Sequence, residues 1–216
     1  GTLKPEFCKQ IYANGIGSIV TQSLYTIYIV GLNMVLKSFT EDAVTVLGIY
    51  YKIQSFFFIP LLGFQQVLLP LFSYHYGAGD RNRNRDILKC SMIFSVAIMA
   101  VATGIFFLFP EKLIQIFSTG SSIVAIGKYA FPVISISFVF AGLTIIITSY
   151  LQGIAHIKSS LFIIVLRQIV LLVPLAWVFH FIGLNAVWWT FPVTEIIASM
   201  TGILIIMILH KQDKTL

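Results

Sequence analysis

The sequence predicts an all-α integral membrane protein with six transmembrane helices. Hydrophobic residues make up 58% of the chain and charged residues only 10%, against roughly a quarter charged in ordinary soluble domains. The apolar stretches repeatedly exceed the ~18 to 20 residues that cross a bilayer as a helix. They are apolar on every face, which excludes the short alternating strands of a membrane barrel. Lipid offers no hydrogen bonds to the backbone, so each stretch must form a helix.

Short polar connectors divide the chain into its expected spans. The spans cover residues 11–36, 43–72, 87–109, 123–150, 160–182 and 184–209. Residues 1–10 are expected to be a cytoplasmic lead-in, residues 11–209 the membrane domain, and residues 210–216 a cytoplasmic tail. The chain begins with Gly1 and shows no short apolar region with a cleavage site, so we expect a fragment without a signal peptide.

The densely polar run from Phe72 to Asp86 is the landmark of the sequence. Gly77 and Gly79 can take positive φ without steric cost, which allows a helix that ends at Tyr76 to stop and turn. Basic residues then begin the next span. This run is therefore expected to be a tight connector at the membrane surface.

The basic residues are divided unequally between the two faces of the membrane. One face receives nine of them, Lys4, Lys9, Arg81, Arg83, Arg85, Lys89, Lys158, Lys211 and Lys214, and the other receives Lys37, Lys112 and Lys128. The richer face is cytoplasmic by the positive-inside rule, which predicts that both termini are cytoplasmic. This distribution explains the net charge of +6, so we expect no nucleic-acid partner.

Proline residues interrupt four of the six expected spans. They are Pro60 and Pro70 in the second span, Pro132 in the fourth, Pro174 in the fifth and Pro192 in the sixth. Each removes a backbone donor and tends to bend its helix. Proline is also common in membrane helices for structural reasons alone, so two interpretations stay open: a wall that rocks around a cavity, and a static bundle.

Polar side chains lie deep inside the expected spans. At about 1.5 Å per residue, Lys52 is about 14 Å and Glu195 about 16 Å from the outer ends of their helices. Gln22, on the first span, reaches about the same level near the bilayer midplane. Arg167 is expected closer to the cytoplasmic face, where a long side chain can snorkel. A charge at midplane costs roughly 3 kcal/mol unless it is paired or faces water, so these residues should face inward.

Two roles for these polar residues remain open. Gln22, Lys52 and Glu195 could line a substrate path, or Lys52 and Glu195 could form a structural ion pair between the second and sixth spans. The sequence contains no Ser-His-Asp arrangement, paired carboxylates, phosphate-binding loop or Cys-pair metal motif. We therefore expect no catalytic residues, no metal site and no bound cofactor, and we do not expect an enzyme.

The connector after the second span resembles the signature of the multidrug and toxic compound extrusion (MATE) family. The resemblance rests on Tyr74, Tyr76, Gly77, Ala78 and Gly79, followed by Arg83, with His75 where the family usually has Asn. Matches in register follow at Lys52–Phe56, Pro60–Gly63, Leu151–Gly153, Arg167–Gln168 and Pro174. The resemblance covers essentially the whole chain.

This resemblance implies the C-terminal six-helix lobe of a twelve-helix exporter. Residues 1–10 would then belong to the linker from a missing N-terminal lobe. The implied activity is efflux of drug-like organic molecules, expected to be cations, by alternating access across the plasma membrane. Coupling would be to H⁺ or Na⁺. The acids that the sodium-coupled branch carries in the first and fourth spans are absent here, so the coupling residue could lie outside this chain.

Two further functions remain as alternatives. The chain could belong to a lipid or polysaccharide-precursor flippase of the same superfamily, which would favour a cationic cavity. It could instead be a membrane scaffold without transport activity, in which the polar midplane residues contact only each other.

Overall fold

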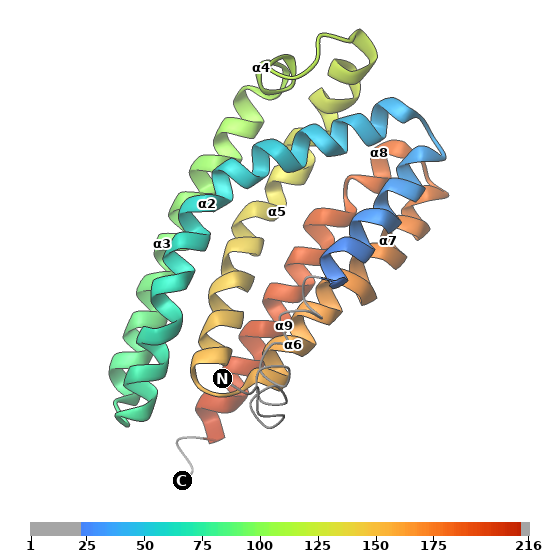
Figure 1. Cartoon of the computed structure of the whole chain (residues 1–216). Coiled ribbons are helices and arrows are strands. Elements are labelled where there is room, and N and C mark those ends of the chain that lie inside the picture. The colour runs from blue at the N-terminus through green and yellow to red at the C-terminus, as the bar shows by residue number, and fades with distance from the viewer. Residues whose placement is uncertain (1–22, 213–216) are drawn as a thin grey trace, which may run out of the picture.

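The structure is a computed structural model that describes residues 23–212, and every regular element in this range is helical (Figure 1). The first described helix runs from Ser23 to Lys37. It is followed by α2 (Glu41–Gly77), α3 (Arg81–Leu108), α4 (Pro110–Gln115), α5 (Ser121–Gly153), α6 (Ile157–Val165), the π-helix η1 (Leu166–Leu171), α7 (Leu172–His180), α8 (Leu184–Val187) and α9 (Thr190–Gln212). The predicted all-α architecture is confirmed.

Five helical segments in the described range are long and apolar enough to cross a membrane. They are α2, α3, α5, the continuous run Ile157–His180 that contains α6, η1 and α7, and the run Leu184–Lys211 that contains α8 and most of α9. The helix Ser23–Lys37 is apolar but shorter. The expected first span, 11–36, begins outside the described residues.

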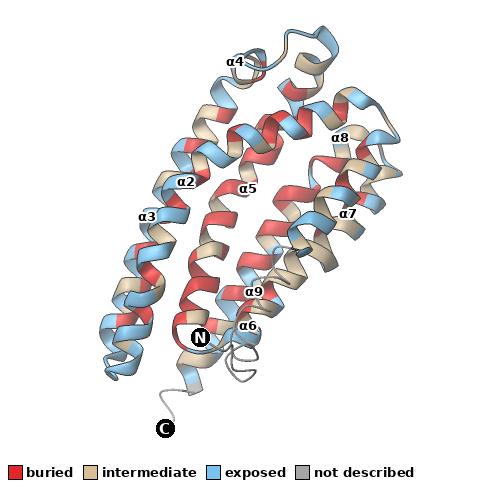
Figure 2. Cartoon of the chain, viewed as in Figure 1, coloured by how far each residue is buried: buried red, intermediate tan, exposed pale blue. Residues whose placement is uncertain are grey.

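Helix α5 is the centre of the bundle. It packs most extensively against α3, α9 and α2. Most of its apolar stretch is buried within the protein, whereas less than half of the apolar stretch of each other long helix is buried (Figure 2). The outer helices therefore present apolar side chains outward, as expected of helices that face lipid or another membrane domain.

Close packing of α3 against α5 depends on a small residue and an interhelical hydrogen bond. A Cβ atom added at Gly142 would lie 2.6 Å from Oγ of Ser95 and 2.8 Å from Cγ of Met99. Nearby, the hydroxyl of Thr103 donates to the backbone carbonyl of Ser135 at 2.9 Å. Small residues and such hydrogen bonds hold membrane helices together. Lipid tails are as apolar as the helix surfaces, so the hydrophobic effect does not drive helices to associate within the bilayer.

The α2–α3 connector forms the tight turn that its glycines predict. Helix α2 ends at Gly77, and Gly79 takes φ +73°. The carboxylate of Asp80 then accepts a hydrogen bond from the backbone N–H of Arg83 at 3.0 Å and caps α3. Helix α2 is longer than the expected span 43–72 at both ends, partly because Thr40 caps its start through the N–H of Ala43.

Helix α2 is bent, and Figure 1 shows its first part crossing over the bundle before the rest descends beside α3. Pro60 and Pro70 lie inside this helix. Proline removes one backbone hydrogen bond and its ring displaces the preceding turn, which bends a helix. The bend brings the start of α2 over the ends of the other helices.

The basic residues segregate between the two ends of the bundle. The α2–α3 turn, the α5–α6 turn and the end of α9 lie at one end, while α4, α8 and the start of α2 lie at the other (Figure 1). Arg81, Arg83, Lys158 and Lys211 belong to the first end by their place in these elements. The helix arrangement thus preserves the charge asymmetry seen in the sequence.

Candidate functional site: a polar cavity in the helical bundle

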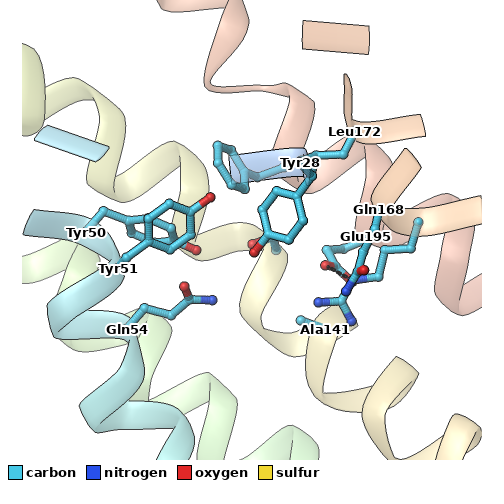
Figure 3. A pocket seen from close by; sticks show the side chains of 11 residues that line it. Tyr28, Tyr50, Tyr51, Gln54, Ala141, Gln168, Leu172 and Glu195 are labelled. Carbon is cyan, nitrogen blue, oxygen red and sulfur yellow. Dashed lines mark ion pairs between the residues drawn. The ribbon is translucent and has the colours of Figure 1, made fainter. Parts of the chain in front are cut away.

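A small cavity lies in the bundle. Its lining residues come from the helix Ser23–Lys37, α2, α5, η1, the start of α7, and α9. Its polar lining includes Tyr28, Tyr51, Gln54, Arg167, Gln168 and Glu195. Figure 3 shows the α2 side chains on one side, Gln168 and Glu195 on the other, and Tyr28 between them. The cavity volume is about 30 Å³, which holds water or a small ion but not a drug-sized molecule.

Glu195 and Arg167 form an ion pair in the wall of this cavity. Nε of Arg167 lies 2.8 Å from Oε1 of Glu195. The side chain of Glu195 is 8% exposed and that of Arg167 is 27% exposed. Because a buried carboxylate without a partner would be costly, Arg167 makes the position of Glu195 tolerable.

The ion pair satisfies only one of the two carboxylate oxygens. Oε2 of Glu195 is buried and has no hydrogen-bond partner among the described residues. Oε1 of Gln168, which also lines the cavity, is buried and lacks a described partner as well. Buried polar atoms are almost always satisfied, so each exception needs an explanation such as a water or an ion.

A π-helix positions both Arg167 and Gln168. The fifth span is α-helical over α6 and α7 but widens to a π-helix over Leu166–Leu171. Pro174 follows within one turn, and proline both lacks an N–H and clashes with the carbonyl four residues earlier, here that of Val170. This proline explains why the α-helical bonding is interrupted at this point. Short π-helical segments are frequent at functional sites.

An aromatic cluster closes the cavity on the side of α2. Tyr50 is 1% exposed and contacts Phe138 and Phe191, with ring centroids 6.3 and 5.6 Å apart. Phe106 and Phe131 extend the same cluster across α3 and α5. Such aromatic packing is rigid and excludes water, so it fixes α2 against the polar cavity.

The residues predicted to contact substrate do not all meet at this cavity. Glu195 lines it, while Gln22 lies outside the described residues. Lys52 is exposed on α2, with its Nζ 5.8 Å from the ring centroid of Phe117. The structural pair between Lys52 and Glu195, one of the two interpretations left open, does not form, because Glu195 pairs with Arg167 instead.

The signature connector lies at the surface of the bundle, away from the cavity. Tyr74 is 71% and Tyr76 42% exposed, and Gly77, Ala78, Gly79 and Arg83 are exposed. The exposed tyrosines fit a position at the level of lipid headgroups. Within the described structure, these residues shape the α2–α3 turn rather than the cavity.

Sequence reasoning missed the role of Arg167, Gln168, Tyr28 and Tyr51. Arg167 was expected closer to the cytoplasmic face than Glu195, and it was not recognised as the partner of Glu195. Pro174 was the available signal, because a proline in a membrane helix releases backbone groups in the turn before it. Periodicity could not reveal the inward direction, since the fifth span is apolar on every face.

The chain matches the model of the MatE family over residues 18–178. The chain belongs to the MatE family. It is 24% identical over 208 residues to the multidrug export protein MepA of Staphylococcus saprophyticus, an alignment that covers 96% of this chain and 46% of that protein. The family consists of transporters, and the expectation that the chain is not an enzyme is confirmed.

Solved MATE structures share the fold. A crystal structure of MATE in the straight conformation covers 100% of this chain with 49% of its own length, at 20% identity and a TM-score of 0.88. A MOP superfamily transporter from Pyrococcus furiosus covers 94% of this chain with 46% of its own length, at 21% identity and a TM-score of 0.85. The chain thus spans about half the length of the curated relatives it matches and forms one lobe of a MATE fold.

Proposed function

We propose that the chain is the C-terminal half of a cation-coupled multidrug efflux antiporter. The observation that carries the proposal is the alignment of 96% of this chain with less than half of a multidrug export protein. A missing N-terminal six-helix lobe would complete the transporter. Alternating access requires two lobes that move around one substrate path, and the exposed apolar faces of this lobe are available to the second lobe and to the bilayer.

The proposed location is the plasma membrane, with both ends of the chain in the cytoplasm. The charge asymmetry between the two ends of the bundle supports this orientation. Drug-like organic cations are the proposed substrates. The coupling ion would be H⁺ or Na⁺, which exchanges against the substrate across the same membrane.

Gln22, Lys52 and Glu195 remain the proposed substrate contacts of this half. Glu195 is the strongest of the three because its carboxylate borders a polar cavity. Cationic molecules would be drawn to this carboxylate, and the cavity is too small to hold them whole. We therefore expect the drug to bind between the two lobes, with this cavity behind it.

Efflux of a fluorescent organic cation from cells that make the full-length transporter tests this proposal. We expect wild-type efflux to stop when the ion gradients are collapsed. We expect Glu195→Gln to reduce efflux at least tenfold at equal membrane abundance, while Lys112→Gln, at the other end of the bundle, leaves it unchanged. Efflux that does not depend on an ion gradient would contradict the proposal, as would efflux by this chain expressed alone and shown to be monomeric.

A flippase remains the second candidate because Arg167 lines the cavity and its side chain is partly exposed. Guanidinium groups recognise phosphate in bidentate fashion. A flippase would move a phosphate-bearing lipid precursor, and the cationic dye would remain inside the cell. Translocation of a labelled anionic lipid in vesicles that contain the full-length protein would favour this candidate.

A further inference from the structure

Two residues that line the cavity, Glu195 and Gln168, carry buried acceptor oxygens that need a partner. Oε2 of Glu195 and Oε1 of Gln168 are both buried without a partner among the described residues. Glu195 as a whole is only 6% exposed. Two unsatisfied acceptor oxygens on residues that line one cavity attract a group that carries positive charge and needs oxygen contacts.

We infer that Oε2 of Glu195 and Oε1 of Gln168 form a site for one small monovalent cation, and that Arg167 competes with this cation for Glu195. The occupant is either a proton on Oε2 or an alkali metal ion held by the oxygens. The inference deepens the proposed function, since it names the residues at which the cation would bind. Its test measures binding and does not depend on transport.

The size of the cavity limits the kind of cation that can bind in it. A volume of about 30 Å³ accommodates a bare ion with a water molecule. Hard alkali ions prefer the carboxylate, amide and hydroxyl oxygens that line this cavity. Bulky organic cations such as choline exceed the space, so they serve as an ionic-strength control in a binding experiment.

The geometry of the ion pair makes Arg167 a competitor. Arg167 contacts Glu195 through Nε and one carboxylate oxygen, at 2.8 Å, whereas strong arginine pairs use two parallel hydrogen bonds. Its side chain is 27% exposed, so it has room to move away from Glu195. A cation on Oε2 would be repelled by the nearby guanidinium, and removal of that charge should strengthen cation binding.

The other described residues that line the cavity around Glu195 carry no positive charge. Tyr28 from the first described helix and Tyr50 and Tyr51 from α2 are the other titratable side chains that line the cavity. Helix α5 contributes Ser137 and Ala141, which carry no charge. Among the described lining residues, Arg167 is therefore the positive charge that a bound cation must oppose.

Thermal unfolding of the purified full-length transporter tests the site. Choline chloride is replaced stepwise by sodium or potassium chloride at constant ionic strength, and a separate series lowers the pH. The variants are Arg167→Gln, Glu195→Gln, the double variant, and Gln168→Leu. The matched control is Lys112→Gln, which removes a positive charge outside the cavity.

We expect Arg167→Gln to respond to the cation at a concentration at least tenfold lower than the wild type. Gln168→Leu should need at least a tenfold higher concentration, and Lys112→Gln should match the wild type. Glu195→Gln and the double variant should not respond. A response to sodium or potassium identifies an alkali ion, and a response to acid alone that is lost in the double variant identifies a proton.

Two results would overturn the inference: a response that persists in Glu195→Gln, and no difference between Arg167→Gln and the wild type in any series. If Arg167→Gln does not fold, binding of radioactive sodium and proton uptake on acidification are compared between wild type, Gln168→Leu and Glu195→Gln. Equal values in all three would then overturn it. A transporter that binds the cation at this site but exports no drug would instead contradict the proposed function and leave the site intact.

Discussion

The backbone N–H of Leu172 donates a hydrogen bond to the carbonyl of Arg167, five residues earlier, where an α-helix would use Gln168. This wider turn belongs to η1 and ends just before Pro174. The α-helical bonding is therefore interrupted at Arg167 and Gln168, the two residues of η1 whose side chains border the cavity. The π-helix is a means of placing consecutive polar residues beside one carboxylate.

Replacing Pro174 with Ala should restore continuous α-helix in the fifth span. The new N–H could bond the carbonyl of Val170, and the ring clash, worth about 3 kcal/mol in a helix interior, would disappear. We expect thermal stability to be retained or raised, and efflux by the full-length transporter to fall at least tenfold because Arg167 and Gln168 would turn away from Glu195. Unchanged efflux would show that the π-helix is not required.

The ion pair between Arg167 and Glu195 should dominate the stability of the polar layer. Breaking a buried pair leaves one charge uncompensated and typically costs about 3 to 5 kcal/mol. We expect Arg167→Met or Glu195→Leu alone to destabilise the protein by at least about 2 kcal/mol, because Arg167 is partly exposed. The double variant should recover most of the loss in denaturant titrations.

Lys52 provides the control for this double-mutant cycle. Its Nζ lies over the ring of Phe117 rather than near Glu195. The effects of Lys52→Met and Glu195→Leu should therefore add within about 0.5 kcal/mol. A larger coupling between these two positions would contradict the pairing seen in the structure.

Gly142 should tolerate no side chain. Gly142→Ala would press a methyl group against Ser95 and Met99, and overpacking of this kind costs about 1 to 3 kcal/mol. The matched control is Gly63→Ala in α2, where no atom outside the local helix lies within 4 Å. Because alanine favours helix by about 0.5 to 1 kcal/mol, the control should be neutral or stabilising in the same denaturant titration.

The orientation of the chain can be tested with single cysteines in a background without Cys8 and Cys90. A membrane-impermeant thiol reagent added outside intact cells should modify cysteine at Ser121 and leave cysteine at Asn82 unmodified. Both positions are exposed, and they lie at opposite ends of the bundle. External labelling at position 82 would reverse the proposed topology and place the signature connector outside the cell.

The sequence by itself determined the membrane class, the helical architecture and the family. These properties depend on the length of apolar runs and on a local signature, both of which are written in consecutive residues. The turn after α2 was also readable, because Gly79 and Asp80 act on their own neighbours in the chain. Glu195 could be selected because no other carboxylate lies deep in the expected spans.

Only the tertiary structure decided which partner Glu195 has. Depth along a helix constrained Lys52 and Glu195 to one level, but direction around the helix axis decides whether two side chains meet. Helices that are apolar on every face carry no periodic signal for that direction. The π-helix then changes the direction of Arg167 and Gln168, and bent α2 turns Lys52 towards Phe117. These rotations arise from packing between distant segments, which no local pattern specifies.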